Sequence, residues 1–391
     1  MLRGGRSDFS PLSQSHKNRD TSTYEFGRIR DTAEEYPMTF QSLSPSFWQK
    51  GSLLHEYTTV LLDQNASYGD LHSASWGLYT LFGTITNLLE RPSDTRHHRD
   101  TFTDTGKALS LRNAARCLWD FMRTSRFLQG VHAGILAAQQ RFPNQRIEVL
   151  YAGSGPFAPL AIPLMRCFSP EEVRFTIMDI HQEAIDAVQQ ILIALNLDMA
   201  GAELVVADAT TYVPPADQRF HVLVSETMKK ALDEEPQVAI THHLAMFLHP
   251  EGVLIPERIV VRACLADMSR EMTFISPDGS PPPARVRQDL GIIGEASLAA
   301  LRPTPGAVDA PSLMKPITIT IPEDRPVTAT TFFLLTYITT FGAIHLNDYD
   351  SGLSYPTVLE PLGNLTPGTS IQFHYTLGDH PQFTYRILDQ E

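Results

Sequence analysis

The sequence is poor in cysteine. Its 391 residues include only three, Cys117, Cys167 and Cys264, which are scattered along the chain. An odd and dispersed set of thiols is typical of reduced, buried side chains and argues against both a disulfide framework and a metal site. The sequence also has no apolar run of membrane-spanning length, and no charged-then-apolar signal peptide opens it. We therefore expect a cytoplasmic protein with no membrane partner and no bound metal.

Positive charge is scarce as well. The chain has 31 Lys and Arg residues against 44 Asp and Glu residues, a net charge of −13. Binding to a nucleic-acid backbone depends on Lys and Arg side chains that neutralise phosphates, so we expect no nucleic-acid partner. The hydrophobic content of 42% is typical of a globular protein, and the length leaves room for two domains.

The first 145 residues predict a tail followed by helices. Residues 1–35 are rich in Ser, Arg, Asp, Thr and Gly, with few core-forming side chains, which predicts a disordered tail. Residues 36–145 are expected to be mainly helical. Apolar and aromatic residues recur from Phe47 to Leu89 and favour two or three helices. Arg91–Thr105 is polar and turn-like, and Ser110 is the expected N-cap of one long helix that reaches about Gln140.

Residues 146–256 have the pattern of a doubly wound α/β domain. The apolar run Ile147–Leu150 leads through Tyr151 and Ala152 into Gly153-Ser154-Gly155, and a helix-compatible segment follows. Glycine is needed there because a backbone without Cβ can turn sharply and let a ligand approach closely. Short apolar strands then alternate with helices, which predicts a parallel, Rossmann-like sheet. The further strands are expected at Val173–Met178, Leu204–Val206, Phe220–Val224 and Val253–Ile255.

Residues 257–391 predict a second, mostly antiparallel β domain. The stretch 276–315 is rich in Pro, Gly and Ala and shows no clear periodicity. Strand-like segments separated by Pro, Gly and Asp turns are found at 259–265, 317–321, 328–338, 369–376 and 382–387. The expected fold class is therefore α/β, with N-terminal helices, a Rossmann-like parallel sheet and a C-terminal antiparallel β domain.

Polar residues follow the strands of the expected parallel sheet, where the ligand crevice of such sheets lies. Asp179 ends the second strand and is placed to accept hydrogen bonds from ribose hydroxyls. Asp208 and Ala209 follow the third strand, where a carboxylate can take an adenine amino group. The third glycine of the dinucleotide motif is missing, since Ala158 stands there, and no hydride-transfer constellation is evident. These observations indicate a nucleoside cofactor other than NAD.

The combination resembles the class I S-adenosylmethionine-dependent methyltransferases, and a longer motif narrows the resemblance. Ser225-Glu226-Thr227-Met228 is followed by Glu234-Glu235 and then by Pro250-Glu251-Gly252. This looks like the double-glutamate loop of the protein arginine N-methyltransferases, in which two carboxylates grip the substrate guanidinium. Paired carboxylates form bidentate, charge-assisted bonds with such a group. The resemblance implies Glu226 and Glu235 as catalytic residues, nine positions apart as in the family, with Glu234 as the alternative second carboxylate.

The resemblance also implies a site for S-adenosylmethionine. The segment from Asp120 to Thr124 is similar to the family's Asp-x-x-Arg-Thr, in which the arginine holds the carboxylate of the cofactor. Asp120 and Arg123, three positions apart, are expected on neighbouring surface of one helix. The implied cofactor-binding residues are Arg123, Ala152, Gly153, Ser154, Gly155, Asp179, Asp208, Ala209 and Ser225.

Three features depart from the family pattern. Tyr151 stands where an acidic residue usually precedes the first glycine, and Lys229-Lys230 stand in the loop's Gly-Tyr positions. The family's Thr-His-Trp loop is not recognisable, and Leu353–Thr357 lies near its expected place. The histidine that would pair with Asp120 is therefore absent or replaced by another residue. The histidines considered as substitutes or as a base are His345, His242 and His243.

The expected activity is N-methylation of a guanidino or amino group on a small molecule or on arginine. The extra N-terminal helices and the altered loop favour a small molecule over protein tails. Two alternatives stay open: the cofactor could serve O- or C-methylation, or a cyclisation or elimination that releases methylthioadenosine, and the fold could be a non-catalytic scaffold. The resembling family is commonly dimeric, so a homodimer is the assembly to test.

Overall fold

The computed structural model describes residues 10–11, 47–89, 99–274, 281–302, 314–359 and 365–388. The expected tail, 1–35, lies outside the described residues except for strand β1 (Ser10–Pro11), which pairs with the C-terminal strand β16 (Gln382–Leu388). The domain boundaries at 145/146 and 256/257 stay predictions. Within the described part, no helix combines the length and hydrophobicity needed to cross a bilayer.

A five-stranded parallel sheet forms the centre of the chain and confirms the α/β class. Its strands are β4 (Ile147–Ala152), β5 (Val173–Asp179), β6 (Ala202–Val206), β7 (Phe220–Ser225) and β8 (Leu248–Ile255), in the order β6-β5-β4-β7-β8. All four neighbouring pairs are parallel. After β4 the chain adds β5 and β6 on one side of it, and then adds β7 and β8 on the other side. Such a reversal of strand order opens a crevice at the carboxyl ends of the strands.

Helices cover both faces of this sheet, as a doubly wound fold requires. Along β4, Val149 and Tyr151 share a buried cluster with side chains of α4 (Phe121–Arg141) and α5 (Gln182–Ala194). Leu150 and Ala152, one position out of phase, belong to a second cluster with α6 (Gln237–Leu244). Alternate side chains of a strand point to opposite faces, so nearly every residue of β4 is buried.

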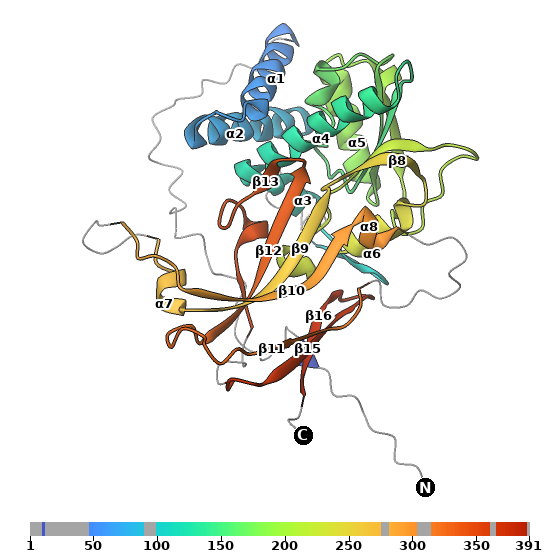
Figure 1. The fold of residues 1–391 in the computed structure, drawn as a ribbon. Helices are drawn as coiled ribbons and strands as arrows, with labels where there is room; N and C mark the ends of the chain where they lie inside the picture. The colour runs from blue at the N-terminus through green and yellow to red at the C-terminus, as the bar shows by residue number, and fades with distance from the viewer. Residues whose placement is uncertain are drawn as a thin grey trace.

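Two helices lie between Phe47 and Thr86, as the apolar pattern of this region predicted. They are α1 (Phe47–Leu62) and α2 (Tyr68–Thr86), and α2 is capped by Ser67, whose hydroxyl accepts a hydrogen bond from the Asp70 amide. Both helices contact α4, and the Gln129 amide of α4 donates to the Leu61 carbonyl at 3.0 Å. In Figure 1 these helices (blue) lie beside the parallel sheet, while the later β strands (orange and red) extend away from it.

The prediction of one long helix from Ser110 to about Gln140 was wrong. Ser110 does cap a helix, but α3 (Leu111–Arg116) is short and passes into the 3-10 turn Cys117–Trp119 before α4 begins. Asp120 makes the break, because it has a non-helical backbone (φ −83°, ψ 80°) and caps α4 by accepting from the Arg123 amide at 3.1 Å. The apolar spacing continues across the break, so periodicity alone did not reveal it.

A β-hairpin occupies part of the segment expected to be turn-like. Strands β2 (Thr101–Thr103) and β3 (Gly106–Ala108) pair antiparallel. They lie against the loop Glu226–Glu235 that follows β7, which we call the carboxylate loop. Strands this short bury little of their own surface, so their sequence carries no period-2 signal. The hairpin is held by contacts with distant parts of the chain, which are described with the site.

The C-terminal part is antiparallel, as predicted. One sheet has the order β10-β9-β12-β13, with β14 pairing to β12, and the other has the order β1-β16-β15-β11. The stretch 276–315, expected to be irregular, contains the eleven-residue strand β10 and the short helix α8. Register shifts between Asp289 and Gly291 and between Ile292 and Gly294 break the alternation of β10, which explains why the pattern concealed it. The elements of this part are β9 (Arg258–Ala266), α7 (Met268–Glu271), β10 (Arg287–Ser297), α8 (Leu298–Leu301), β11 (Ile317–Thr320), β12 (Thr331–Phe341), β13 (Ile344–Leu346), β14 (Thr357–Val358), β15 (Ser370–Thr376) and β16.

Candidate active site

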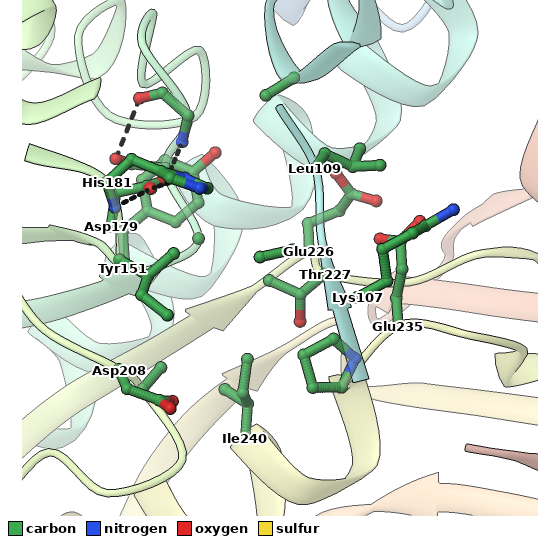
Figure 2. Close-up of a pocket in the computed structure, with 18 of the residues that line it drawn as sticks. Lys107, Leu109, Tyr151, Asp179, His181, Asp208, Glu226, Thr227, Glu235 and Ile240 are labelled. Atoms are coloured by element: carbon green, nitrogen blue, oxygen red, sulfur yellow. Dashed lines mark hydrogen bonds and ion pairs between the residues drawn. The ribbon is translucent and has the colours of Figure 1, made fainter. Parts of the chain in front are cut away.

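A cavity opens at the carboxyl ends of the parallel strands and is covered by the β2–β3 hairpin. The cavity contains about 860 Å³ of space, open solvent included. Figure 2 shows two groups of side chains in it. Asp179, His181 and Tyr151 lie at one end, which we call the nucleoside end. Lys107, Glu226, Thr227 and Glu235 lie at the other, which we call the acceptor end.

The glycine turn after β4 lines the cavity and requires glycine on two counts. Gly153 and Gly155 have positive φ angles of 72° and 60°, which side chains rarely adopt. A Cβ on Gly153 would also lie 2.2 Å from Cγ2 of Thr227. The amide of Gly155 donates to Oδ2 of Asp179 at 2.8 Å, which ties the turn to the end of β5. The turn therefore presents bare backbone to the cavity.

At the nucleoside end, Asp179 and Asp208 hold local structure and also face the cavity. Oδ1 of Asp179 accepts from the His181 amide at 2.9 Å and lies 3.2 Å from Nδ1 of the same histidine. The hydrogen bond to Asp179 raises the pKa of His181, against the opposing effect of burial. Oδ1 of Asp208 accepts from the amide and hydroxyl of Thr210 at 2.8 and 2.7 Å. A carboxylate offers about four acceptor sites, so both residues can still bind a ligand.

At the acceptor end, Arg123 donates through Nη2 to Oε2 of Glu226. Both side chains are largely covered, with 14% and 9% of their surface exposed. The second oxygen of Glu226, Oε1, is buried and has no hydrogen-bond partner among the described residues. Burial raises the pKa of Glu226 and Arg123 opposes the rise. A buried carboxylate oxygen without a donor is costly, so this atom marks where a cationic ligand would be stabilised.

Glu235 lies on the same cavity, also 9% exposed. Burial, together with the negative charge of Glu226, raises the pKa of Glu235 to about 7, while Arg123 and Lys107 oppose the rise. A carboxyl group with a pKa near neutrality is suited to accept a proton at physiological pH.

Its neighbour Glu234 has a different environment. Nζ of Lys229 donates to Oε1 of Glu234 at 2.7 Å, and Nζ of Lys107 donates to Oε2 at 2.7 Å. Burial opposes ionisation, but these two hydrogen bonds lower the pKa of Glu234 to about 2. Lys230, the other lysine of the loop, donates to the carbonyl of Pro356 at 3.3 Å. Glu235, and not Glu234, therefore faces the cavity with Glu226, and the assignment of a catalytic role to either residue stays a prediction.

Asp120, which the family resemblance pairs with a histidine, has other hydrogen-bond partners in this structure. Oδ2 of Asp120 accepts from the hydroxyl of Ser351 at 2.7 Å and from the amide of Gly352 at 2.9 Å. Ser351 precedes the segment Leu353–Thr357, which lies near the expected place of the unrecognised Thr-His-Trp loop. The three candidate histidines are engaged elsewhere: their ring nitrogens lie within hydrogen-bond distance of the carbonyls of Ala343 (His345), Leu301 (His242) and Tyr212 (His243).

Two of the expected cofactor residues lie behind the cavity wall. Ala152 and Ser225 are fully buried and do not line the cavity, although their neighbours Gly153 and Glu226 do. The hydroxyl of Ser225 lies 3.2 Å from that of Thr227, and the Gln237 amide donates to the Ser225 carbonyl at 3.0 Å. The remaining expected residues, Arg123, Gly153, Ser154, Gly155, Asp179, Asp208 and Ala209, all line the cavity.

Sequence reasoning missed several side chains of the site. His181 and the hairpin residues Thr103, Thr105 and Lys107 line the cavity, and no motif pointed to them. The one sequence signal for His181 was its place two positions after Asp179, the last residue of β5. A histidine there can form a hydrogen bond with the carboxylate of the strand-end acid. Among the described residues, no group of three His, Cys, Asp or Glu side chains has metal-ligand geometry.

Comparison with known proteins gives a likeness of structure. No family model matches the sequence, and no curated protein matches it. Among solved structures, the chain is similar to the Trypanosoma brucei PRMT1 enzyme–prozyme heterotetrameric complex with AdoHcy, at 8% identity and a TM-score of 0.48, over 71% of this chain and 92% of that chain. It is also similar to an open conformation of Arabidopsis thaliana protein arginine methyltransferase 10, at 13% identity and a TM-score of 0.46, over 68% of this chain and 86% of that chain. At these identities the likeness concerns the fold alone.

Proposed function

We propose that this protein is an S-adenosylmethionine-dependent N-methyltransferase that acts on a guanidino or amino group. One observation supports the proposal most strongly: Oε1 of Glu226 is buried and lacks a donor among the described residues, and Glu226 lines the same cavity as Glu235 and the glycine turn. Two carboxylates that face one space favour a cation there. A cationic nitrogen would supply the donor that Glu226 lacks.

The nucleoside end fits the adenosyl part of the cofactor. The bare backbone at Gly153 and Gly155 leaves room for a ligand, and Asp179 stands at the strand end where ribose hydroxyls are bound in related sheets. Asp208 would accept from the adenine amino group. Arg123 uses one N–H donor for Glu226 among the described residues, and a guanidinium has five, so it could also bind the carboxylate of the cofactor.

The acceptor end fits a nitrogen nucleophile. Glu226, fixed by Arg123, would orient the acceptor through charge-assisted hydrogen bonds. Glu235, with a pKa of about 7, would take the proton that the nitrogen loses. When bound, S-adenosylmethionine supplies an electrophilic methyl group on its sulfonium. The protein's contribution would then be positioning and electrostatic stabilisation of the acceptor.

The test is incubation of the purified protein with methyl-labelled S-adenosylmethionine and a panel of free amino acids, guanidines, amines, phenols and arginine peptides, followed by mass spectrometry. The proposal predicts a labelled N-methyl product together with S-adenosylhomocysteine. A labelled O- or C-methyl product would contradict the choice of nitrogen as acceptor. Methylthioadenosine formed without an acceptor would instead indicate cyclisation or elimination, and binding without turnover would indicate a scaffold. Homodimer formation and a cytoplasmic location stay predictions.

A further inference from the structure

The β2–β3 hairpin is fastened on both sides of the cavity. On the nucleoside side, the Thr101 hydroxyl lies 2.9 Å from Nε2 of His181, the residue that contacts Asp179. On the acceptor side, the amide of Lys107 donates to the carbonyl of Glu234 at 2.8 Å. The hairpin therefore crosses from the end of β5 to the loop that carries Glu235. In Figure 2 Lys107 lies at the same end of the cavity as Glu235.

The hairpin is seated against the carboxylate loop without free space. Gly106 has a φ of 137°, and a Cβ built there would lie 2.9 Å from the Glu234 carbonyl, 3.1 Å from the Pro236 nitrogen and 3.2 Å from Cγ of Pro381. The amide of Glu234 donates to the carbonyl of Pro381 at 2.8 Å. Three segments distant in the sequence, namely the hairpin, the carboxylate loop and the turn before β16, thus meet beside the acceptor end.

Ion pairs hold the same junction together, and we call the group formed by Lys107, Lys229 and Glu234 the charged clamp. Glu234 accepts from Lys107 of the hairpin and from Lys229 of the loop, and Nζ of Lys107 also lies 3.9 Å from Oδ2 of Asp100. Asp100 in turn accepts from the Ser110 amide at 2.8 Å, which anchors the base of the hairpin to α3. The carboxylate that the sequence left as an alternative catalytic residue therefore holds the hairpin in place.

We infer that the hairpin restricts the acceptor to free small guanidines, because it forms a wall beside the loop that carries Glu235, where it would meet the flanking residues of a polypeptide acceptor. The inference rests on the proposed function, since it concerns the acceptor of the same site. Thr103, Thr105 and Lys107 of the hairpin line the cavity. A peptide that bound there would have to displace the hairpin from Glu234 or leave peptide groups without hydrogen-bond partners.

The experiment compares binding of free and peptide-embedded guanidines to the full chain saturated with S-adenosylhomocysteine. The probes are L-arginine, agmatine and guanidinoacetate, against the pentapeptide acetyl-Gly-Gly-Arg-Gly-Gly-amide, each titrated by calorimetry. We expect the best free guanidine to bind at least about 30-fold more tightly than the pentapeptide, the effect of one or two unpaired peptide groups. Turnover of each probe is measured in parallel.

Two variants test whether the hairpin causes the difference. Gly106→Val forces the hairpin away from Glu234, and Lys107→Ala removes the clamp with a smaller change to the backbone. In both we expect the preference to fall to less than about threefold, with affinity for S-adenosylhomocysteine retained. The matched control is Asp104→Asn, at an exposed position in the turn of the hairpin that does not line the cavity, and it should keep the wild-type preference.

Each outcome decides the inference. A wild-type preference below about 30-fold, or a preference unchanged in both Gly106→Val and Lys107→Ala, would overturn it. Failure of every guanidine to bind would overturn it together with a guanidino group as the proposed acceptor. If free guanidines bind in preference to the peptide but none is methylated, the restriction by the hairpin stands and the proposed N-methyltransferase activity fails.

Discussion

Neutralising Glu235 tests whether this carboxylate serves function or structure, because the two roles predict opposite changes in the free energy of unfolding. Loss of a functional, unfavourably buried charge should raise it, whereas loss of a structural charge should lower it. Burial raises the pKa of Glu235 from the ordinary 4.5 to about 7. A carboxyl group with a raised pKa holds its proton more tightly in the folded protein, so its ionised form lowers the free energy of unfolding. This decrease in the free energy of unfolding is absent below about pH 4.5 and complete above about pH 7. The difference between the two pKa values corresponds to about 3 kcal/mol.

Glu235→Gln should therefore raise the free energy of unfolding by about 3 kcal/mol at pH 8.5 and by less than about 1 kcal/mol at pH 5. Urea titrations of the two proteins at both pH values measure the effect, and turnover should be lost in the variant. The adjacent Glu234→Gln is the matched control. Its lysine partners lower the pKa of Glu234 to about 2, so its charge stabilises the fold above the ordinary pKa, and the substitution should lower stability at pH 8.5.

Destabilisation at pH 8.5 by Glu235→Gln, as by Glu234→Gln, would refute the reasoning. It would show that the folded protein holds the Glu235 charge by favourable partners, as in an ordinary ion pair. A buried carboxylate that costs stability and is nevertheless required for turnover is the result expected of a group placed for chemistry.

Four further predictions concern the site. Glu226→Gln should lower kcat/KM about 100- to 10,000-fold in a methyl-transfer assay while calorimetry shows cofactor affinity retained, and full activity would remove the residue from the mechanism. Asp179→Ala should weaken S-adenosylmethionine binding at least about tenfold by calorimetry, and unchanged binding would contradict the nucleoside end. Asp120→Ala should lower the free energy of unfolding by about 2 kcal/mol and Ser351→Ala by about 1 kcal/mol in urea titrations, whereas equal, negligible effects would contradict the cap and its bond. The wild-type kcat/KM should rise with pH through about 7 as Glu235 ionises, and the absence of such a rise would exclude it as the base.

The sequence was sufficient for the parallel sheet because its central strands, β4, β5 and β7, are buried on both faces and end in recognisable residues. The run before Gly153 and the acids Asp179 and Asp208 fixed both the strands and the edge at which the cavity opens. The helix break at Asp120 was not predicted because the apolar spacing continues through it, although aspartate is a favoured N-cap. Strand β10 was lost because its bulges interrupt the alternation.

The acceptor end was only partly visible in the sequence. The double-glutamate motif located the loop but could not choose between Glu234 and Glu235, because the choice depends on Lys107, more than a hundred positions away along the chain. The partner of Asp120 was equally hidden, since Ser351 carries no motif and meets it only through the fold. Residues recruited over such separations leave no local signature.

The most direct measurement of the central claim is a crystal structure of the protein with S-adenosylhomocysteine and a free guanidine that it binds. The account predicts the ribose hydroxyls at the carboxylate of Asp179 and a guanidinium N–H donating to Oε1 of Glu226, with Glu235 beside it. A nucleoside bound elsewhere, or a guanidinium that leaves Oε1 of Glu226 without a partner, would contradict it.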